Sequence, residues 1–268
     1  MNDKSFIYFI LILILAGGAG FLLSQAYYVD YDHDTLPGFN SNSSSSPIIS
    51  RTAKPMVTPR PTISNALSPT PKPSPNGILQ KVPFTAQAPF GEWTDPRQQD
   101  GCEEASALMA VSWARGETFT LEEAKAKILK ISDWEQEKFG NFHDTSSQDT
   151  VDRIFKDYFN FDDVRLVKNI TADDIIDELE KGNLVVIPSN GRALGNPYFT
   201  PPGPDHHMLV VIGYDYATDE FITNDPGTRQ GGSFRYSKFV LFGSVRDYPT
   251  GDHDQIDEIE KVMIVVSK

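Results

Sequence analysis

Cysteine and positive charge are both scarce in this chain. Cys102 is the only cysteine in 268 residues, which excludes an internal disulfide. Lys and Arg number 24 against 37 Asp and Glu, so the formal net charge is −13. A protein of that sign repels a phosphate backbone, and we therefore expect no nucleic-acid partner. We also find no internal repeats in the sequence.

A hydrophobic run is present near the N-terminus. Residues 6–23 are uncharged and mostly apolar. As a helix rising 1.5 Å per residue they would reach ~27 Å, just enough to cross a bilayer. Lys4 precedes the run, and Asp30 and Asp32 follow it. Because the basic flank stays in the cytoplasm, the rest of the chain is expected outside it.

The same segment can be interpreted in two ways. Ser24-Gln25-Ala26 carries small residues where a signal peptidase favours them, and cleavage there would give a secreted protein. The apolar run is longer than a usual cleaved segment, so we favour a retained transmembrane anchor over residues 1–26. Both interpretations export the remainder, and the retained anchor predicts a protein tethered to the membrane.

The next segment, residues 27–78, has the composition of a stalk. A serine run at 43–46 is followed by prolines that alternate with Ser, Thr and Lys. Such a segment cannot bury enough apolar surface to fold, and proline keeps it extended, so we predict a disordered tether. Residues 79–268 remain, which is one domain's worth of chain and long enough for a sizeable core.

Cys102 lies where a helix is expected to begin. It follows the turn-forming pair Asp100-Gly101 and precedes small or apolar residues at helical spacing. Gly116 provides a stop, so the pattern predicts a helix over residues 102–115 with one face in the core. At the first turn of that helix, free N–H groups and the helix dipole favour a thiolate, which suits a nucleophile.

Two observations limit that interpretation. A lone cysteine in a globular domain is most often a buried packing residue. Glu103 and Glu104 follow Cys102 directly, and nearby carboxylates raise the pKa of a thiol. A catalytic role for Cys102 therefore requires a base elsewhere in the chain.

The remaining pattern changes from helices to strands along the domain. We predict helices at 120–131, 147–159 and 171–181, strands at 164–167, 184–188, 207–214, 220–224, 232–236 and 262–266, and a helical turn at 237–241. This order predicts an α+β fold with an antiparallel sheet packed on the cysteine helix.

His207 and Asp225 are the candidate base and its partner. If the strands at 207–214 and 220–224 form a hairpin, the two residues lie at its open end, with Cβ atoms ~5 Å apart as cross-strand neighbours. Asp225 can then hold one imidazole nitrogen and direct the other at a thiol. A histidine that opens a strand and an Asp-Pro-Gly turn are each ordinary structural features. Their combination with Cys102 carries the prediction.

The domain resembles the C39-like cysteine peptidases of the papain-like superfamily over residues 79–268. The resemblance rests on four motifs: Val82-Pro83-Phe84-Thr85-Ala86-Gln87, Gly101-Cys102-Glu103-Glu104-Ala105-Ser106, His207 through Asp215, and Asn224-Asp225-Pro226. It implies a papain-like fold in which Cys102 is the nucleophile, His207 the general base and acid, and Asp225 the orienting residue. It also implies that Gln87, with the Cys102 backbone N–H, stabilises the oxyanion.

The sequence departs from the family pattern in two respects. Gln87 lies 15 positions before Cys102, farther than in papain, so the segment between must loop out. Gln98 and Gln99 are closer to Cys102 and are alternatives for the oxyanion role. Nothing in the chain resembles the transporter to which leader-peptide-cleaving relatives are often fused, which leaves that substrate class in doubt.

The sequence therefore predicts an exported, membrane-tethered cysteine peptidase that hydrolyses peptide or amide bonds. Its expected substrate is a peptide, a protein or a cell-wall peptide, and we expect a monomer without a cofactor. A non-catalytic surface binding module of papain-like fold is one alternative. An amidase or acyltransferase that uses the same Cys-His pair is another.

We predict no metal site. Asp205, His206 and His207 are consecutive, but neighbours in an extended strand point to opposite faces and would not readily share an ion. His206 is accordingly predicted at the rim or surface.

Three loop segments complete the expectations. Phe90 and Trp93 are candidates to line a substrate cleft, with capping of the core as the alternative. The Gly-, Pro- and Asn-rich loop 190–204 is expected to border the site. The acidic stretch 252–260 is expected to be a solvated connection, since it lacks the ligand spacing of a calcium loop.

Overall fold

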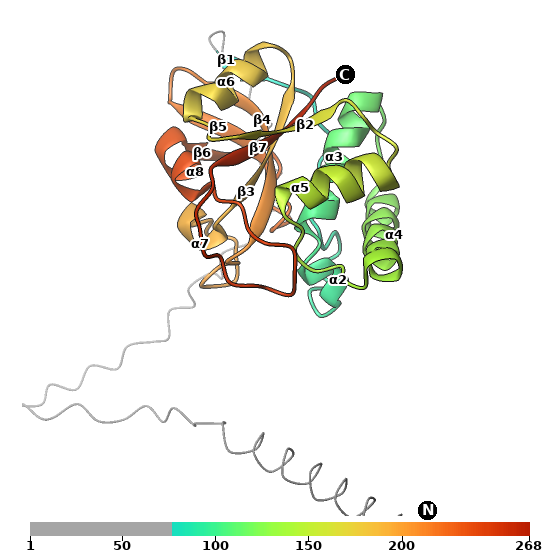
Figure 1. Cartoon of the computed structure of the whole chain (residues 1–268). Helices are drawn as coiled ribbons and strands as arrows, with labels where there is room; N and C mark the ends of the chain where they lie inside the picture. Colours follow the sequence, from blue (N-terminus) through green and yellow to red (C-terminus); the bar gives the residue numbers. More distant parts are fainter. Residues whose placement is uncertain (1–76) are drawn as a thin grey trace, which may run out of the picture. The chain divides into compact units, whose positions relative to one another are not determined.

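Residues 77–268 are the part of the chain that the structure, a computed structural model, describes. They form one antiparallel sheet with helices on both faces (Figure 1). The predicted anchor and nearly all of the predicted stalk lie outside the described residues. Within residues 77–268, no helix is both long enough and apolar enough to cross a membrane.

The sheet has seven strands, and every pairing in it is antiparallel, as the sequence predicted. The strands are β1 (Gly77–Leu79), β2 (Val164–Lys168), β3 (Leu184–Ser189), β4 (His207–Asp215), β5 (Glu220–Asn224), β6 (Phe234–Ser237) and β7 (Val262–Val266). Their order is β2-β7-β3-β4-β5-β6, and β1 pairs with the end of β4.

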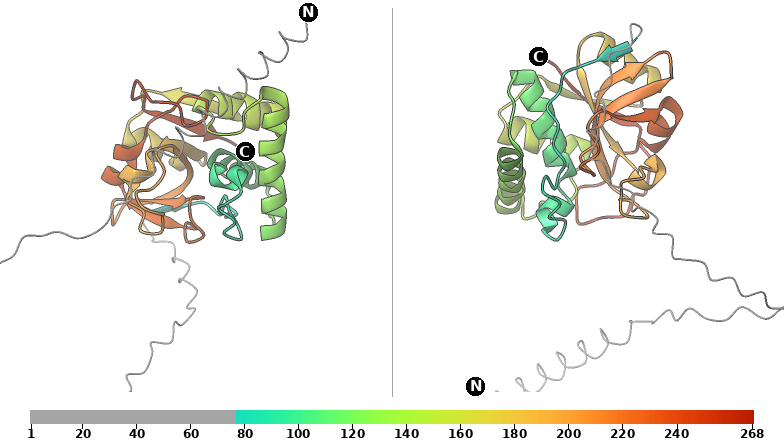
Figure 2. Two further views of the ribbon diagram at one scale, coloured as in Figure 1. Left: turned by 90° about the horizontal axis from the view of Figure 1, so that it is seen from below. Right: turned by 180° about the vertical axis from the view of Figure 1, so that it is seen from behind.

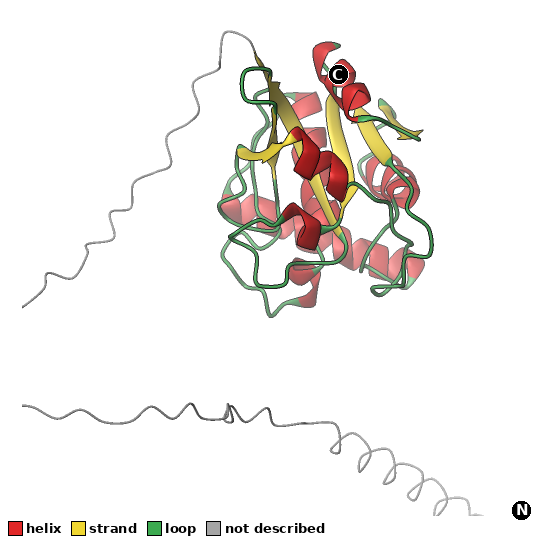
Figure 3. Ribbon diagram, turned by 90° about the vertical axis from the view of Figure 1, so that its left-hand side faces the viewer, coloured by secondary structure: helices red, strands yellow, loops and turns green. Residues whose placement is uncertain are grey.

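The helices lie in two layers, one on each face of the sheet (Figures 2 and 3). They are α2 (Pro96–Gln99), α3 (Cys102–Arg115), α4 (Leu121–Phe139), α5 (Ser147–Asp149), the π-helix η2 (Thr150–Tyr158), α6 (Ala172–Glu180), α7 (Gly191–Leu194) and α8 (Lys238–Ser244). Side chains of α3 and η2 share one core with the sheet, and side chains of α6 and α8 share the other. Because both faces are covered, β3, β4 and β7 are buried along their whole length.

The predicted cysteine helix is confirmed as α3, and its observed bounds match the predicted range 102–115. Its residues from Cys102 to Trp113 are all buried, because the sheet covers one side and α4 and η2 cover the other. Ser106 Oγ donates a hydrogen bond of 3.2 Å to the carbonyl oxygen of Met208. This bond ties α3 to the second residue of β4, directly after His207.

The second helix, α4, is longer than predicted. Its capping box at Thr120 and Glu123 is present, as the sequence indicated. The helix continues past the predicted end at 131 to Phe139 and stops at Gly140, whose φ of 79° is left-handed. Lys138 and Gly140 are a basic residue followed by a glycine, the same stop signal that Arg115 and Gly116 form. The observed end of α4 was therefore predictable from the sequence.

Strand β1 lies against β4 at a glycine. Gly213 pairs with Leu79, and a Cβ at Gly213 would overlap the carbonyl oxygen of Ile78 and lie 3.1 Å from the Leu79 Cα. The register of β4 with β5 also shifts between Val211 and Gly213. Only glycine permits this close approach, so the N-terminal strand depends on one residue of β4.

Candidate active site

A cleft of about 970 Å³ lies at the start of β4 and contains three of the four predicted site residues. Gln87, Cys102 and His207 line it. They come from the segment before α2, from the first turn of α3 and from the first residue of β4. Residues far apart in the sequence therefore share one cavity of a size that accommodates a ligand.

The fourth residue, Asp225, lies behind His207 and is fully buried. Its Oδ1 is 2.8 Å from His207 Nε2, a hydrogen bond in which the imidazole N–H donates. The two are not a register pair: β4 and β5 pair last at Val210 and Asn224, and His207 lies opposite Ser189 of β3. The hairpin brings the side chains together diagonally, just beyond the end of β5.

Asp225 is held by three further donors. Tyr236 OH donates to its Oδ2 at 2.6 Å, Asn196 Nδ2 donates to the same oxygen at 3.1 Å, and the Gly227 N–H donates to Oδ1 at 3.0 Å. Burial raises the pKa of Asp225, but the charge of His207 and the hydrogen bonds from His207 and Tyr236 outweigh it, so the pKa lies below its ordinary value. Asp225 is therefore an ionised carboxylate that can fix the His207 ring.

Sequence reasoning did not find Tyr236 or Asn196. Tyr236 lies in β6, and Asn196 lies in the loop after α7. Neither residue belongs to a local motif, and each meets Asp225 only because the sheet and the loop 190–204 fold over the end of β5.

The His207 ring is also confined by packing. Phe199 contacts it edge-on, with ring centroids 5.3 Å apart. A Cβ at Gly227 would lie 2.9 Å from His207 Cε1 and 2.7 Å from Phe199 Cε1. The turn after Asp225 therefore needs glycine at this position to let the backbone approach the imidazole.

Cys102 is nearly buried, with 4% of its surface exposed. Its Sγ donates a hydrogen bond of 2.9 Å to Glu103 Oε2. Burial raises the pKa of the thiol well above its ordinary value, and the charge of Glu103 raises it further. The sequence-based expectation that the helix start favours a thiolate is therefore wrong for this geometry, because burial and the neighbouring carboxylate outweigh the helix dipole.

Glu103 is itself buried beneath the cleft. Its Oε1 accepts hydrogen bonds from Tyr248 OH at 2.7 Å and from the Thr145 N–H at 3.3 Å. Burial and the nearby charge of Asp144 raise the pKa of Glu103 to about 8. Near neutral pH most of this carboxyl is protonated, which removes most of the negative charge next to the thiol.

The three candidate glutamines differ in where their amides lie. Gln87 is buried on the cleft wall, and its backbone N–H donates to the Pro226 carbonyl at 2.9 Å. Its Nε2 donates to the Gln99 carbonyl at 2.6 Å, which leaves a second N–H on the same nitrogen. The Gln98 side chain instead donates to the Glu92 carbonyl at 3.3 Å. Gln87 and Gln99 line the cleft and Gln98 does not, so the position of the side chains favours Gln87 and Gln99 over Gln98.

The sequence predicted His206 at the rim or surface, and the surface position is wrong. His206 is 8% exposed, because the Tyr248 ring stacks on it at 4.9 Å. Its Nδ1 lies 2.6 Å from Asp144 Oδ2. His206 and His207 both line the cleft, and their rings bond to different carboxylates, Asp144 and Asp225.

The loops around the cleft follow the expectations in part. Trp93 lines the cleft, whereas Phe90 is 44% exposed and lies near Lys125. The loop 190–204 borders the cleft, as predicted. The stretch 252–260 is mostly exposed, but its first part lines the cleft as well, so it is more than a solvated connection.

Comparison with known proteins identifies the family. A family model described as the Peptidase_C39 like family matches residues 79–242. The chain belongs to the Peptidase_C39 like family. The matched part of the chain includes Gln87, Cys102, His207 and Asp225. Membership in this C39-like family suggests a cysteine peptidase and makes hydrolysis the activity class to consider.

Several solved structures match this C39-like chain, and one of them is similar to it at low identity. It is a crystal structure of a candidate C39-like peptidase from Bacillus anthracis, 17% identical, with a TM-score of 0.42. The similarity covers 72% of this chain and 98% of the other. No curated protein matches the chain. The family assignment therefore rests on the sequence model.

Proposed function

We propose that this protein is an exported, membrane-tethered cysteine peptidase that uses Cys102, His207 and Asp225 to hydrolyse peptide bonds. The observation that carries the proposal is the cleft that Cys102 and His207 share, with His207 hydrogen-bonded to the buried Asp225. Membership in the C39-like family supports the same activity class.

The proposed reaction is acyl transfer through the Cys102 sulfur. Because Asp225 accepts from Nε2 of His207, the other ring nitrogen, Nδ1, is available to take the thiol proton. The sulfur forms a bond to the carbon of the scissile amide, and His207 returns the proton to the leaving amine. Water then releases the acyl group from Cys102 and restores the thiol.

Gln87 is the proposed side-chain donor to the oxyanion. It lines the cleft with Cys102, and the Cys102 backbone N–H lies at the start of a helix, where it is free to donate. A donor of this kind contributes ~3 kcal/mol to stabilisation of the transition state.

Alkylation of Cys102 in the full-length protein tests the proposal. At pH 7 the raised pKa of the thiol makes an unassisted reaction slow, so rapid labelling requires His207 to take the proton. We expect iodoacetamide to label the wild type at least about tenfold faster than His207→Ala, and peptide hydrolysis to disappear in Cys102→Ser.

His143→Ala is the matched control for that experiment. His143 is a partly buried histidine whose hydrogen bonds go to Asn141, away from the His207–Asp225 pair. It should label like the wild type. Equal labelling of wild type and His207→Ala would exclude the peptidase and favour the binding module. Labelling with turnover of wall amides but not of peptides would favour the amidase.

Export and tethering are a separate part of the proposal, which rests on the apolar run at 6–23 and on the charges that flank it. Protease added to intact cells should digest the domain of the full-length protein. Cell fractionation should find the full-length protein in the membrane fraction. A variant that lacks residues 1–26 should be absent from that fraction. Protection of the full-length domain in intact cells would contradict export.

A further inference from the structure

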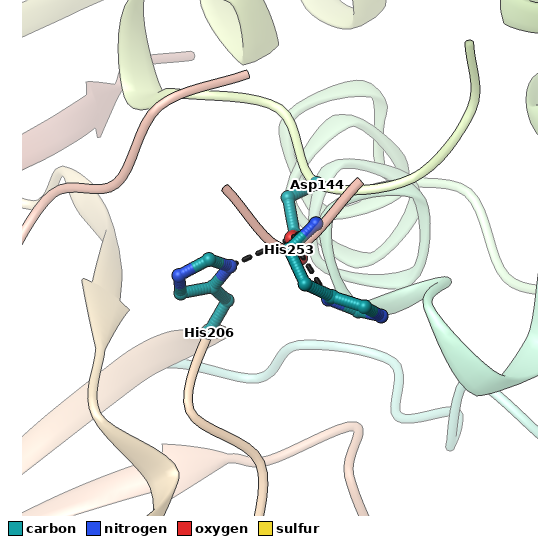
Figure 4. Close-up of side chains that lie close together, drawn as sticks. All are labelled: Asp144, His206 and His253. Atoms are coloured by element: carbon teal, nitrogen blue, oxygen red, sulfur yellow. Dashed lines mark hydrogen bonds and ion pairs between the residues drawn. The ribbon is translucent and has the colours of Figure 1, made fainter. Parts of the chain in front are cut away.

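A second group of titratable side chains lies in the wall of the same cleft. Asp144, His206 and His253 come from three separate segments, and Figure 4 shows the two imidazoles turned toward the Asp144 carboxylate. One ligand atom from each residue lies within 4.8 Å of the others. The proposed peptide chemistry uses none of the three.

Donors converge on a single oxygen of this group. Asp144 Oδ2 lies 2.6 Å from His206 Nδ1, 3.0 Å from His253 Nδ1 and 3.0 Å from the His253 backbone nitrogen. Around a tetrahedral zinc ion with ligand bonds of about 2.0–2.1 Å, ligand atoms are about 3.3 Å apart. The two separations from Asp144 Oδ2 are shorter than that value and the ligand nitrogens of the two rings lie within 4.8 Å of each other, so small side-chain movements would admit an ion.

The backbone holds the three residues in place. The Gly251 N–H donates to the Asp144 carbonyl at 3.1 Å and fixes the 251–254 loop against the segment before α5. His253 has a φ of 56°, in the left-handed region, and directs both its backbone N–H and its ring at the carboxylate. Tyr248 stacks on His206 and fixes the other ring.

A second carboxylate supports one of the imidazoles from behind. His253 Nε2 lies 3.4 Å from Asp100 Oδ1. A carboxylate at the far nitrogen of a metal-binding histidine keeps the proton on that nitrogen and leaves the near one free to bind the ion. When an ion replaces the hydrogen bond between His253 Nδ1 and Asp144, Asp100 can accept the ring proton at Nε2 and leave the Nδ1 lone pair to the metal.

We infer that Asp144, His206 and His253 bind a divalent transition metal, Zn²⁺ first. Two imidazoles and one carboxylate are zinc ligands, whereas Ca²⁺ and Mg²⁺ prefer sites built from oxygen alone. The ion would be bound by Asp144 Oδ2 and by Nδ1 of each ring, with the ring protons on Nε2. Its fourth position would face the cleft. This inference does not depend on whether Cys102 acts as a nucleophile.

Metal binding by the full-length protein tests the inference without an activity assay. We expect calorimetry to find one Zn²⁺ per chain at micromolar concentration, and Co²⁺ to give the visible absorption bands of a tetrahedral site. His253→Ala and Asp144→Asn should each weaken binding at least about tenfold. His253 is largely exposed, so its truncation should leave the fold intact, which circular dichroism can verify.

Two further variants separate this site from other ways of holding zinc. His143→Ala, whose ring centroid is 6.2 Å from that of His253, is the matched control and should bind like the wild type. Cys102→Ser should also bind. Loss of binding in Cys102→Ser would place the ion at the thiol and overturn the inference. Equal binding by His253→Ala and the wild type, or no saturable binding, would overturn it as well.

Discussion

Burial is the main cause of the raised pKa of the only thiol in the chain, and Glu103, whose Oε2 lies 2.9 Å from Cys102 Sγ, raises it further. Above pH 8 the carboxyl is ionised and its charge opposes formation of a thiolate. We expect Glu103→Gln to lower the midpoint of the pH profile of Cys102 alkylation by about one unit, equivalent to ~1.4 kcal/mol. The measurement is the alkylation rate between pH 6 and pH 10.

Glu104→Gln is the control for this prediction at the neighbouring position. The Glu104 side chain accepts a hydrogen bond from Ser132 at 2.6 Å rather than one from the thiol, and its charge affects the thiol less than that of Glu103 does. The midpoint of the pH profile of Cys102 alkylation should therefore move less in Glu104→Gln than in Glu103→Gln. An unchanged midpoint in Glu103→Gln would show that burial alone raises the pKa.

The sequence could name the central residues of the candidate site but not their surroundings. Cys102, His207 and Asp225 each mark the beginning or end of a strong periodic element, so local signals locate them. The residues that surround them, such as Tyr236 and Asp144, carry no local signal. Their contacts join segments many residues apart, and only the folded sheet brings those segments together.

At the scale of elements, the attachment of β1 to β4 depends on Gly213. We expect Gly213→Ala to lower the free energy of unfolding by about 1–3 kcal/mol, because the new Cβ would overlap the Ile78 carbonyl and push β1 away. Urea unfolding of the full-length protein measures the change. Limited proteolysis should also cut more readily near residues 77–80.

Gly243→Ala is the matched control for that substitution. Gly243 lies in α8, and a Cβ there would meet no other atom within 4 Å. Because alanine favours a helix over glycine by up to about 1 kcal/mol, this variant should be slightly more stable than the wild type. If both alanine variants unfold alike, the close approach at Gly213 has no energetic consequence.

Complete start and stop signals located the cysteine helix correctly, whereas α4 carries such signals too but was predicted to end at 131 instead of 139. The cysteine helix begins after Asp100-Gly101 and ends before Gly116, and both bounds are confirmed. The short β1 and α7 were missed, since three or four residues show no periodicity. The second helical layer was missed as well. Buried strands read as continuous apolar runs, which do not reveal that helices cover both faces.

At the scale of the whole molecule, three buried glutamates set the pH dependence of stability. Burial raises the pKa of Glu103 to about 8 and that of Glu135 to about 9, and it raises the pKa of Glu104 as well. Between about pH 4.5 and pH 8 the folded chain holds protons that the unfolded chain has released. The free energy of unfolding should therefore fall as pH rises, by up to ~1.4 kcal/mol per pH unit for each such group.

Urea unfolding at pH 5.5 and pH 8 measures this dependence. The double variant Glu104→Gln, Glu135→Gln should lose less stability over the same interval, since two of the raised groups are absent. Asp225 has a lowered pKa, and its contribution is lost only in acid, outside this window. Stability that rises from pH 5.5 to pH 8 would contradict the prediction.

The thiol lies in the helical layer and the imidazole–carboxylate pair at the sheet, and apart from β1 these two layers occupy successive parts of the described chain. The helical layer of α3, α4 and η2, which contains Cys102, comes before residue 159. Strands β2 to β7 come after residue 163; His207 is the first residue of β4, and Asp225 directly follows β5. A chain divided between 159 and 163 would leave the sulfur on one fragment and its base on the other. Under the proposed function, the two fragments together would be a split enzyme, in which turnover reports their reassembly.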